Sequence, residues 1–145
     1  MANGQNLRAP VGSDFRRQLL WQKAQDFAAE LVTVLSRLPP SQASNAISSQ
    51  LLRAGASIAA NIAEGYGRYS QAAYRSHLSI ARGSAFEAES WLDLLVRTGF
   101  LTPEAGDPLI ARCIEVQKLL TVRMKSLSDG KTYAARDEAN DYRLD

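Results

Sequence analysis

The sequence predicts an all-α protein, folded as an antiparallel up-down-up-down four-helix bundle. Apolar residues recur at helical spacing in four long segments, and each segment is bounded by residues that start or stop helices. No alternating apolar pattern or hairpin signal predicts a strand, and short connections between long helices favour antiparallel neighbours. We expect a flexible lead-in over residues 1–13, the bundle over 14–128, and a polar, flexible tail over 129–145.

The first helix is expected over residues 14–37. Ser13 or Asp14 is a suitable N-cap, because a short oxygen-bearing side chain can accept a hydrogen bond from the free amides of a first turn. The helix must stop before Pro39 and Pro40, since proline has no amide hydrogen for the helical ladder.

The second helix is expected to begin after Ser41 or Ser44 and to end at Ala63 or Glu64, where two glycines, Gly65 and Gly67, stop it. Most of its apolar residues are small. A glycine inside a helix costs about 1 kcal/mol relative to alanine, so we expect Gly55 to allow another backbone to approach closely.

The third helix is expected to begin near Ser70 and to end at Gly99. It carries the clearest pattern in the chain, with apolar residues spaced alternately four and three positions apart over three heptads. These residues form a predicted core seam: Tyr74, Leu78, Ala81, Ala85, Ala88, Leu92 and Leu95.

The fourth helix has two possible starts. Thr102 followed by Pro103 is an N-cap with proline at the first helical position, and Asp107 before Pro108 offers a second start. Its apolar stripe comprises Leu109, Cys113, Val116, Leu120, Met124 and Leu127.

Composition limits the classes of function. The chain has 145 residues, 46% hydrophobic and 22% charged, which is typical of one globular domain. No run reaches the ~18 apolar residues of a membrane span, and the N-terminal segment lacks the apolar core of a secretion signal. We therefore expect a cytoplasmic protein that does not engage a membrane.

Polar residues on the second helix form an unusual stripe. Serine and asparagine are unfavourable inside helices, and a solvated face ordinarily carries Lys, Glu and Gln. The spacing places on one helix face the four residues Arg53, Ser57, Asn61 and Glu64. The stripe predicts a specific hydrogen-bond network, either buried between helices or presented to a partner.

The third helix carries groups that match this stripe, including Ser84 and Glu87. We expect Arg82 to pair with Glu64, or Glu87 to pair with Arg53, across the two helices. Structural pairing and recognition of a partner both remain open at this point, because buried polar groups must find partners but the sequence does not say which.

Two blocks of sequence resemble a known family. QLLRAGASIAANIAEGYGR (Gln50 to Arg68) and SHLSIARGSAFEAE (Ser76 to Glu89) closely resemble the four-helix-bundle proteins of the 23S rRNA intervening-sequence family, and the resemblance extends over residues 15–127. It implies a ring-like homopentamer. Related bundles that accompany diversity-generating reverse transcriptases bind nucleic acid and the polymerase.

Basic residues predict the contacts with a partner. Four arginines and one acid lie between residues 45 and 82, whereas three acids and one base lie between 83 and 101. Arginine suits phosphate, and tyrosine can stack on unpaired bases. The candidate contacts are therefore Arg53, Tyr66, Arg68, Tyr69, Arg75 and Arg82. For the two tyrosines the alternative is that they cover the end of the bundle.

Catalysis and cofactors are not expected. The single histidine, His77, has no second His or Cys nearby in sequence, and Cys113 lies in an apolar stripe.

The leading hypothesis is a non-enzymatic homo-oligomeric scaffold that binds structured RNA or other nucleic acid. The alternative is a protein–protein interaction module, and a nuclease is the least favoured. Apolar residues outside the seam support self-association: Phe86, Trp91 and Leu94.

Overall fold

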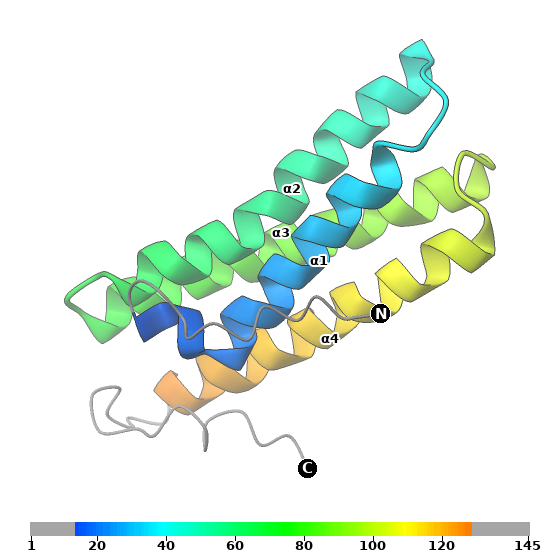
Figure 1. The fold of residues 1–145 in the computed structure, drawn as a ribbon. Coiled ribbons are helices and arrows are strands. Elements are labelled where there is room, and N and C mark those ends of the chain that lie inside the picture. The colour runs from blue at the N-terminus through cyan, green and yellow to red at the C-terminus, as the bar shows by residue number, and fades with distance from the viewer. Residues whose placement is uncertain (1–13, 129–145) are drawn as a thin grey trace, which may run out of the picture.

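The computed structural model describes residues 14–128, which form four α-helices and one short 3₁₀ helix and contain no strand (Figure 1). The elements are η1 (Asp14–Arg17), α1 (Leu19–Leu35), α2 (Gln42–Tyr66), α3 (Gln71–Arg97) and α4 (Pro103–Ser128). The all-α class is confirmed. The expected lead-in, with the candidate cap Ser13, and the expected tail lie outside the described residues. No helix among those described is long and apolar enough to cross a membrane.

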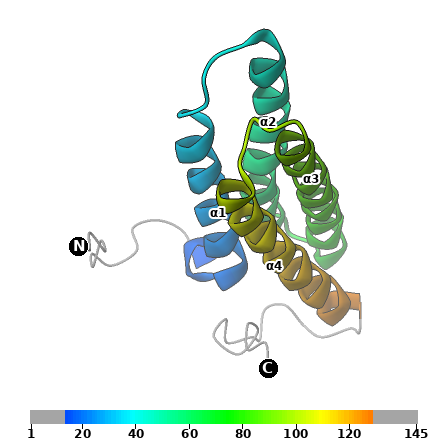
Figure 2. The same cartoon turned by 90° about the vertical axis from the view of Figure 1, so that its right-hand side faces the viewer.

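Each helix packs against the next along the chain, and α4 also packs against α1. The largest contact joins α2 and α3, which run side by side in both views (Figures 1 and 2). Ser57 meets Ser84 and Asn61 meets His77, so residue numbers rise along α2 as they fall along α3. This contact brings the two resembling blocks of sequence together.

Three of the predicted helix starts are confirmed. The hydroxyl oxygens of Ser41, Ser70 and Thr102 each accept a hydrogen bond from the backbone N–H three residues later, at 3.0, 3.0 and 3.2 Å. The last of these bonds decides the onset of α4, which begins at Pro103 and continues through Pro108. Gly99 has a φ of 80°, the left-handed conformation expected after the end of α3.

The predicted first helix is wrong at its start. Asp14 belongs to the separate 3₁₀ helix, and α1 follows Gln18, whose backbone is extended and whose side chain makes no capping bond. Gln18 is fully buried, and the Phe15 ring packs edge-on against Trp21 at 5.1 Å between centroids. The helical ladder that periodicity alone would continue is broken at this buried glutamine.

The core contains all seven residues of the predicted α3 seam. Of the predicted α4 stripe, Met124 is only half-buried and the other five members are buried. Helix α4 also buries Gln117 and Arg123, which the apolar pattern did not predict. The Arg123 guanidinium lies 6.0 Å from the ring centroid of Tyr74, so its charge is placed against an aromatic face.

Two glycines of α2 permit close packing. A Cβ on Gly55 would overlap the Leu31 side chain, so a close neighbour exists but is a side chain and not the expected backbone. Gly65 does not end the helix as predicted, because it lies inside α2 and Gly67 is the cap. A Cβ on Gly65 would lie 2.7 Å from the Cβ of His77, closer than real Cβ atoms approach. Glycine at this position therefore sets the distance between α2 and α3.

Candidate functional site

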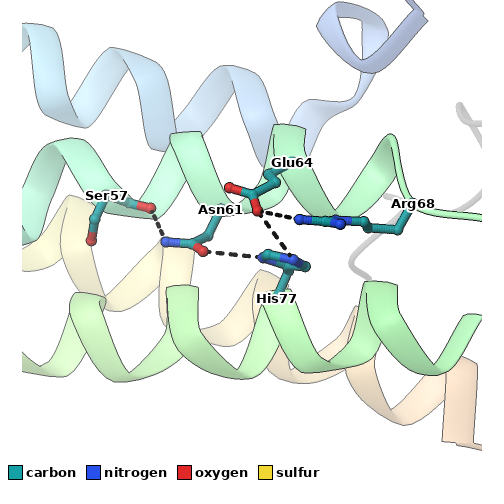
Figure 3. A network of polar contacts seen from close by, with 5 residues as sticks. All are labelled: Ser57, Asn61, Glu64, Arg68 and His77. Carbon is teal, nitrogen blue, oxygen red and sulfur yellow. Dashed lines mark hydrogen bonds and ion pairs between the residues drawn. The ribbon is translucent and has the colours of Figure 1, made fainter.

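A chain of polar contacts connects α2 to α3 along the predicted stripe (Figure 3). The hydroxyls of Ser57 and Ser84 are hydrogen-bonded at 2.7 Å across the two helices. The Asn61 amide nitrogen donates to the Ser57 carbonyl oxygen at 2.9 Å. Both α2 side chains are half-buried, so the network lies between the helices.

Asn61 also orients the ring of His77. Because the Asn61 amide nitrogen donates to the Ser57 carbonyl oxygen, the amide oxygen Oδ1 faces His77. An amide oxygen can only accept a hydrogen bond, so Nδ1 of His77 donates to it at 3.2 Å. The other ring nitrogen, Nε2, lies 3.4 Å from a carboxylate oxygen of Glu64. Both nitrogens of the ring are thus engaged by α2, and the imidazole, with 17% of its side chain exposed, joins the two helices.

Glu64 ends the network on the solvent side. Arg68 Nη2 donates to a Glu64 carboxylate oxygen at 2.7 Å, one turn further along the chain. This hydrogen bond, together with the charge of His77, lowers the pKa of the Glu64 carboxyl below its usual 4.5. Glu64 therefore remains ionised at acidic pH where a free glutamate would begin to bind protons.

The predicted cross-helix ion pairs are wrong. Glu64 pairs with Arg68 and His77, whereas Arg82 lies on the opposite side of α3, against α4. Glu87 accepts a hydrogen bond from the indole nitrogen of Trp91 at 3.0 Å, one turn away on its own helix, and does not pair with Arg53.

The role of His77 was not predicted from the sequence, although a signal existed. His77 lies seven residues before Ser84, on the same face of α3. Once Ser57 is placed opposite Ser84, this spacing brings His77 level with Asn61 and Glu64. Within residues 14–128, no group of three or more His, Cys, Asp or Glu side chains is placed to hold a metal ion.

A second feature lies on the other side of α3. A cleft of about 520 Å³ opens between α3 and α4 and is lined by Arg82, Phe86, Ile114, Gln117, Lys118, Thr121 and Val122. Its lining includes two cations and no acid. Two of its apolar side chains are substantially exposed, Phe86 at 46% and Val122 at 44%.

The remaining candidate contacts do not converge on one site. Arg53 and Arg75 are exposed and form no ion pair or hydrogen bond with any described residue. Tyr66 is half-buried and packs edge-on against Tyr74, with 6.4 Å between centroids, as expected of a residue that covers the bundle end. Tyr69 is fully exposed in the connection between α2 and α3.

Cys113 is a core residue, as predicted. Its thiol donates to the Ala85 carbonyl oxygen at 3.0 Å between α4 and α3. Burial, with a smaller contribution from the charge of Glu89, raises the pKa of the Cys113 thiol to about 12. A thiol in this state is protonated at neutral pH and is a poor nucleophile.

Comparison with known proteins identifies the family. Residues 16–122, more than half of the chain, match the family described as 23S rRNA-intervening sequence protein. The chain belongs to this family. The resemblance seen in the sequence is therefore confirmed. The search of curated proteins finds no match.

A solved structure supports the assignment of this intervening-sequence protein. It is the crystal structure of a protein with unknown function from the S23 ribosomal protein family of Bacteroides thetaiotaomicron VPI-5482. The two chains share 36% identity with a TM-score of 0.70, and the match covers 74% of this chain and 99% of the other.

Proposed function

We propose that this 23S rRNA-intervening sequence protein is a non-enzymatic, homo-oligomeric scaffold that binds structured RNA through its arginines. The observation that carries the proposal is that Arg53 and Arg75 are exposed and have no acidic partner in the described part of the chain. An arginine that is not neutralised internally is available to phosphate, which its planar guanidinium fits well.

Assembly into an oligomer would strengthen such contacts. We propose an antiparallel up-down-up-down protomer in a ring-like homopentamer, a number that comes from the family resemblance. The exposed apolar side chain of Ile80 supports self-association, because exposed apolar surface of this kind usually marks an interface. Repetition of a weak phosphate contact around a ring raises the overall affinity.

The geometry also supports a role without catalysis. A general base needs a nitrogen or oxygen that can reach the substrate, whereas both ring nitrogens of His77 face groups of α2. Loss of an RNA-cleaving activity on His77→Ala would contradict this part of the proposal. A cytoplasmic location forms part of this proposal.

Fluorescence anisotropy with a labelled RNA hairpin tests the RNA-binding proposal. We expect binding at low salt that weakens steeply as salt rises, and a loss of about tenfold or more in the Arg53→Ala/Arg75→Ala double variant. Arg97→Ala is the matched control, because the Arg97 charge is already paired with Asp93 at 2.6 Å. An intact oligomer, verified by light scattering, that binds no hairpin at low salt would contradict the proposal.

One observation favours the protein-interaction alternative. A hollow of about 410 Å³ on α3 is lined by Glu87, Ser90, Trp91, Asp93 and Leu94, which combine acidic and apolar side chains. Such a surface suits a basic protein segment better than an RNA. A partner that co-purifies from the native host and survives nuclease treatment would support this alternative.

A further inference from the structure

We propose that the α3–α4 cleft binds an unpaired RNA strand, with a base stacked on Phe86 and phosphates held by Arg82 and Lys118. The proposal rests on the proposed function and deepens it, because it names the site and the kind of RNA. Neither Phe86 nor Lys118 was among the residues that the sequence suggested as RNA contacts.

Arg82 is already oriented for an anion. The Thr121 hydroxyl donates to the Gln117 carbonyl oxygen at 2.9 Å, which leaves its oxygen to accept from Arg82 Nε at 2.9 Å. The guanidinium carbon lies 4.9 Å from the centroid of the Phe86 ring. The hydrogen bond uses Nε alone, and the two terminal nitrogens make no hydrogen bond to the described residues. A phosphate at the cleft would meet a guanidinium whose position is fixed in advance.

The positive charge continues beyond the cleft. Arg75 lies seven residues before Arg82 on α3, and Lys125 lies seven residues after Lys118 on α4. Seven residues are two helical turns, so cations recur about 10 Å apart on each side of the groove. Glu89 accepts a hydrogen bond of 2.7 Å from the Gln117 amide and is not part of the cleft lining. The groove is thus a basic track with an aromatic residue beside it.

An unpaired strand fits this surface better than a duplex. Proteins that bind single strands combine a positive groove with aromatic side chains on which bases stack, whereas a duplex presents phosphates and keeps its bases stacked internally. The cleft volume of about 520 Å³ is comparable with ordinary small-ligand sites. The apolar floor formed by Phe86, Ile114 and Val122 would lie under a base and remain uncovered by a duplex.

Binding of a short fluorescein-labelled oligouridine, compared with the same strand paired to oligoadenine, tests the inference in the full chain. We expect the wild type to prefer the single strand. Phe86→Ala should weaken binding about tenfold, and so should Phe86→Leu, which keeps apolar bulk but removes the stacking surface. Lys118→Ala should weaken it about fivefold and lower the salt slope by about one.

Two matched controls separate the cleft from general effects. Val32→Ala removes an apolar side chain from α1 that is more exposed than Phe86, and Arg97→Ala removes a cation that is already paired. Both should bind the oligouridine as the wild type does. Circular dichroism verifies that each variant is folded, and light scattering measures its mass.

The outcomes distinguish this inference from the proposed function. A wild type that binds neither oligouridine nor a structured hairpin would overturn both. Wild-type binding that is unchanged in Phe86→Leu and Lys118→Ala but lost in Arg53→Ala would overturn the inference alone. A variant with lower mass and unchanged RNA affinity per subunit would show that the cleft is a contact between copies and would also overturn it.

Discussion

The two sides of α3 use polar residues in opposite ways. Toward α2, Ser84 and His77 meet partners within the chain, and the network closes at Glu64 and Arg68 (Figure 3). Toward α4, Arg82 is fixed by a single bond through Nε beside a cleft that holds two cations and no acid. We refer to these two regions as the α2–α3 seam and the α3–α4 cleft.

The difference indicates that charge on a helix does not by itself mark a binding site. Four arginines lie between residues 45 and 82, yet Arg68 is neutralised by Glu64 whereas Arg82 retains nitrogens for a ligand. Buried polar networks with complete partners specify how helices pack. We therefore assign packing to the seam and binding to the cleft.

The largest effect is expected from Gly65→Ala in the seam. The new Cβ would lie 2.7 Å from the His77 Cβ, an atom attached directly to the α3 backbone, so the helices must separate. We expect a loss of about 1–3 kcal/mol in the free energy of unfolding, measured by urea denaturation.

Gly83→Ala is the matched control for this substitution. Gly83 is also a mid-helix glycine, but nothing lies within 4 Å of its Cβ position. Alanine there should leave stability unchanged or raise it by up to ~1 kcal/mol through helix propensity. Equal destabilisation by both substitutions would show that close packing at Gly65 is not the cause.

A smaller effect is expected when the seam loses hydrogen bonds but keeps its spacing. Asn61→Ala and His77→Ala should each cost about 1 kcal/mol, because each leaves a half-buried polar group without its partner. A double-mutant cycle should give a coupling energy of about 0.5–1.5 kcal/mol. Strictly additive losses would mean that the two side chains do not act as a pair. RNA affinity should stay at the wild-type value in both variants.

The smallest effect concerns pH. Because the folded-state pKa of Glu64 lies below 4.5, the stabilisation from its contacts with Arg68 and His77 is present above that pH. It is lost as the pH falls through the folded value. Urea midpoints measured from neutral pH to well below 4.5 should therefore fall less steeply in Glu64→Gln than in the wild type. Identical acid profiles would show that this carboxylate contributes nothing to stability.

Most of the fold could be predicted from the sequence because it depends on local rules. The three caps, Ser41, Ser70 and Thr102, act on amides of their own helices, and the α3 heptads fix which face is buried. The start of α1 was missed because burial of Gln18, a tertiary effect, overrides local periodicity.

The members of the candidate site were predicted only in part, because His77 was missed and Arg53 and Glu87 do not join the network. Ser57, Asn61 and Glu64 do form a network. Their partners on α3 are Ser84 and His77, and the heptad pattern does not say whether these two positions face α2 or α4. Arg82 and Ser84 are two residues apart, so they point to opposite sides of the helix and meet different neighbours. Choosing between those neighbours requires the rotation of α3 relative to α2 and α4, which periodicity does not supply.

The salt dependence of oligouridine binding tests most directly the assignment of packing to the seam and binding to the cleft. The slope of log affinity against log salt counts the phosphates that the protein neutralises. We predict that Lys118→Ala lowers this slope by about one per contact and that Asn61→Ala leaves it unchanged. A slope that is insensitive to Lys118→Ala but reduced by Asn61→Ala would contradict the account.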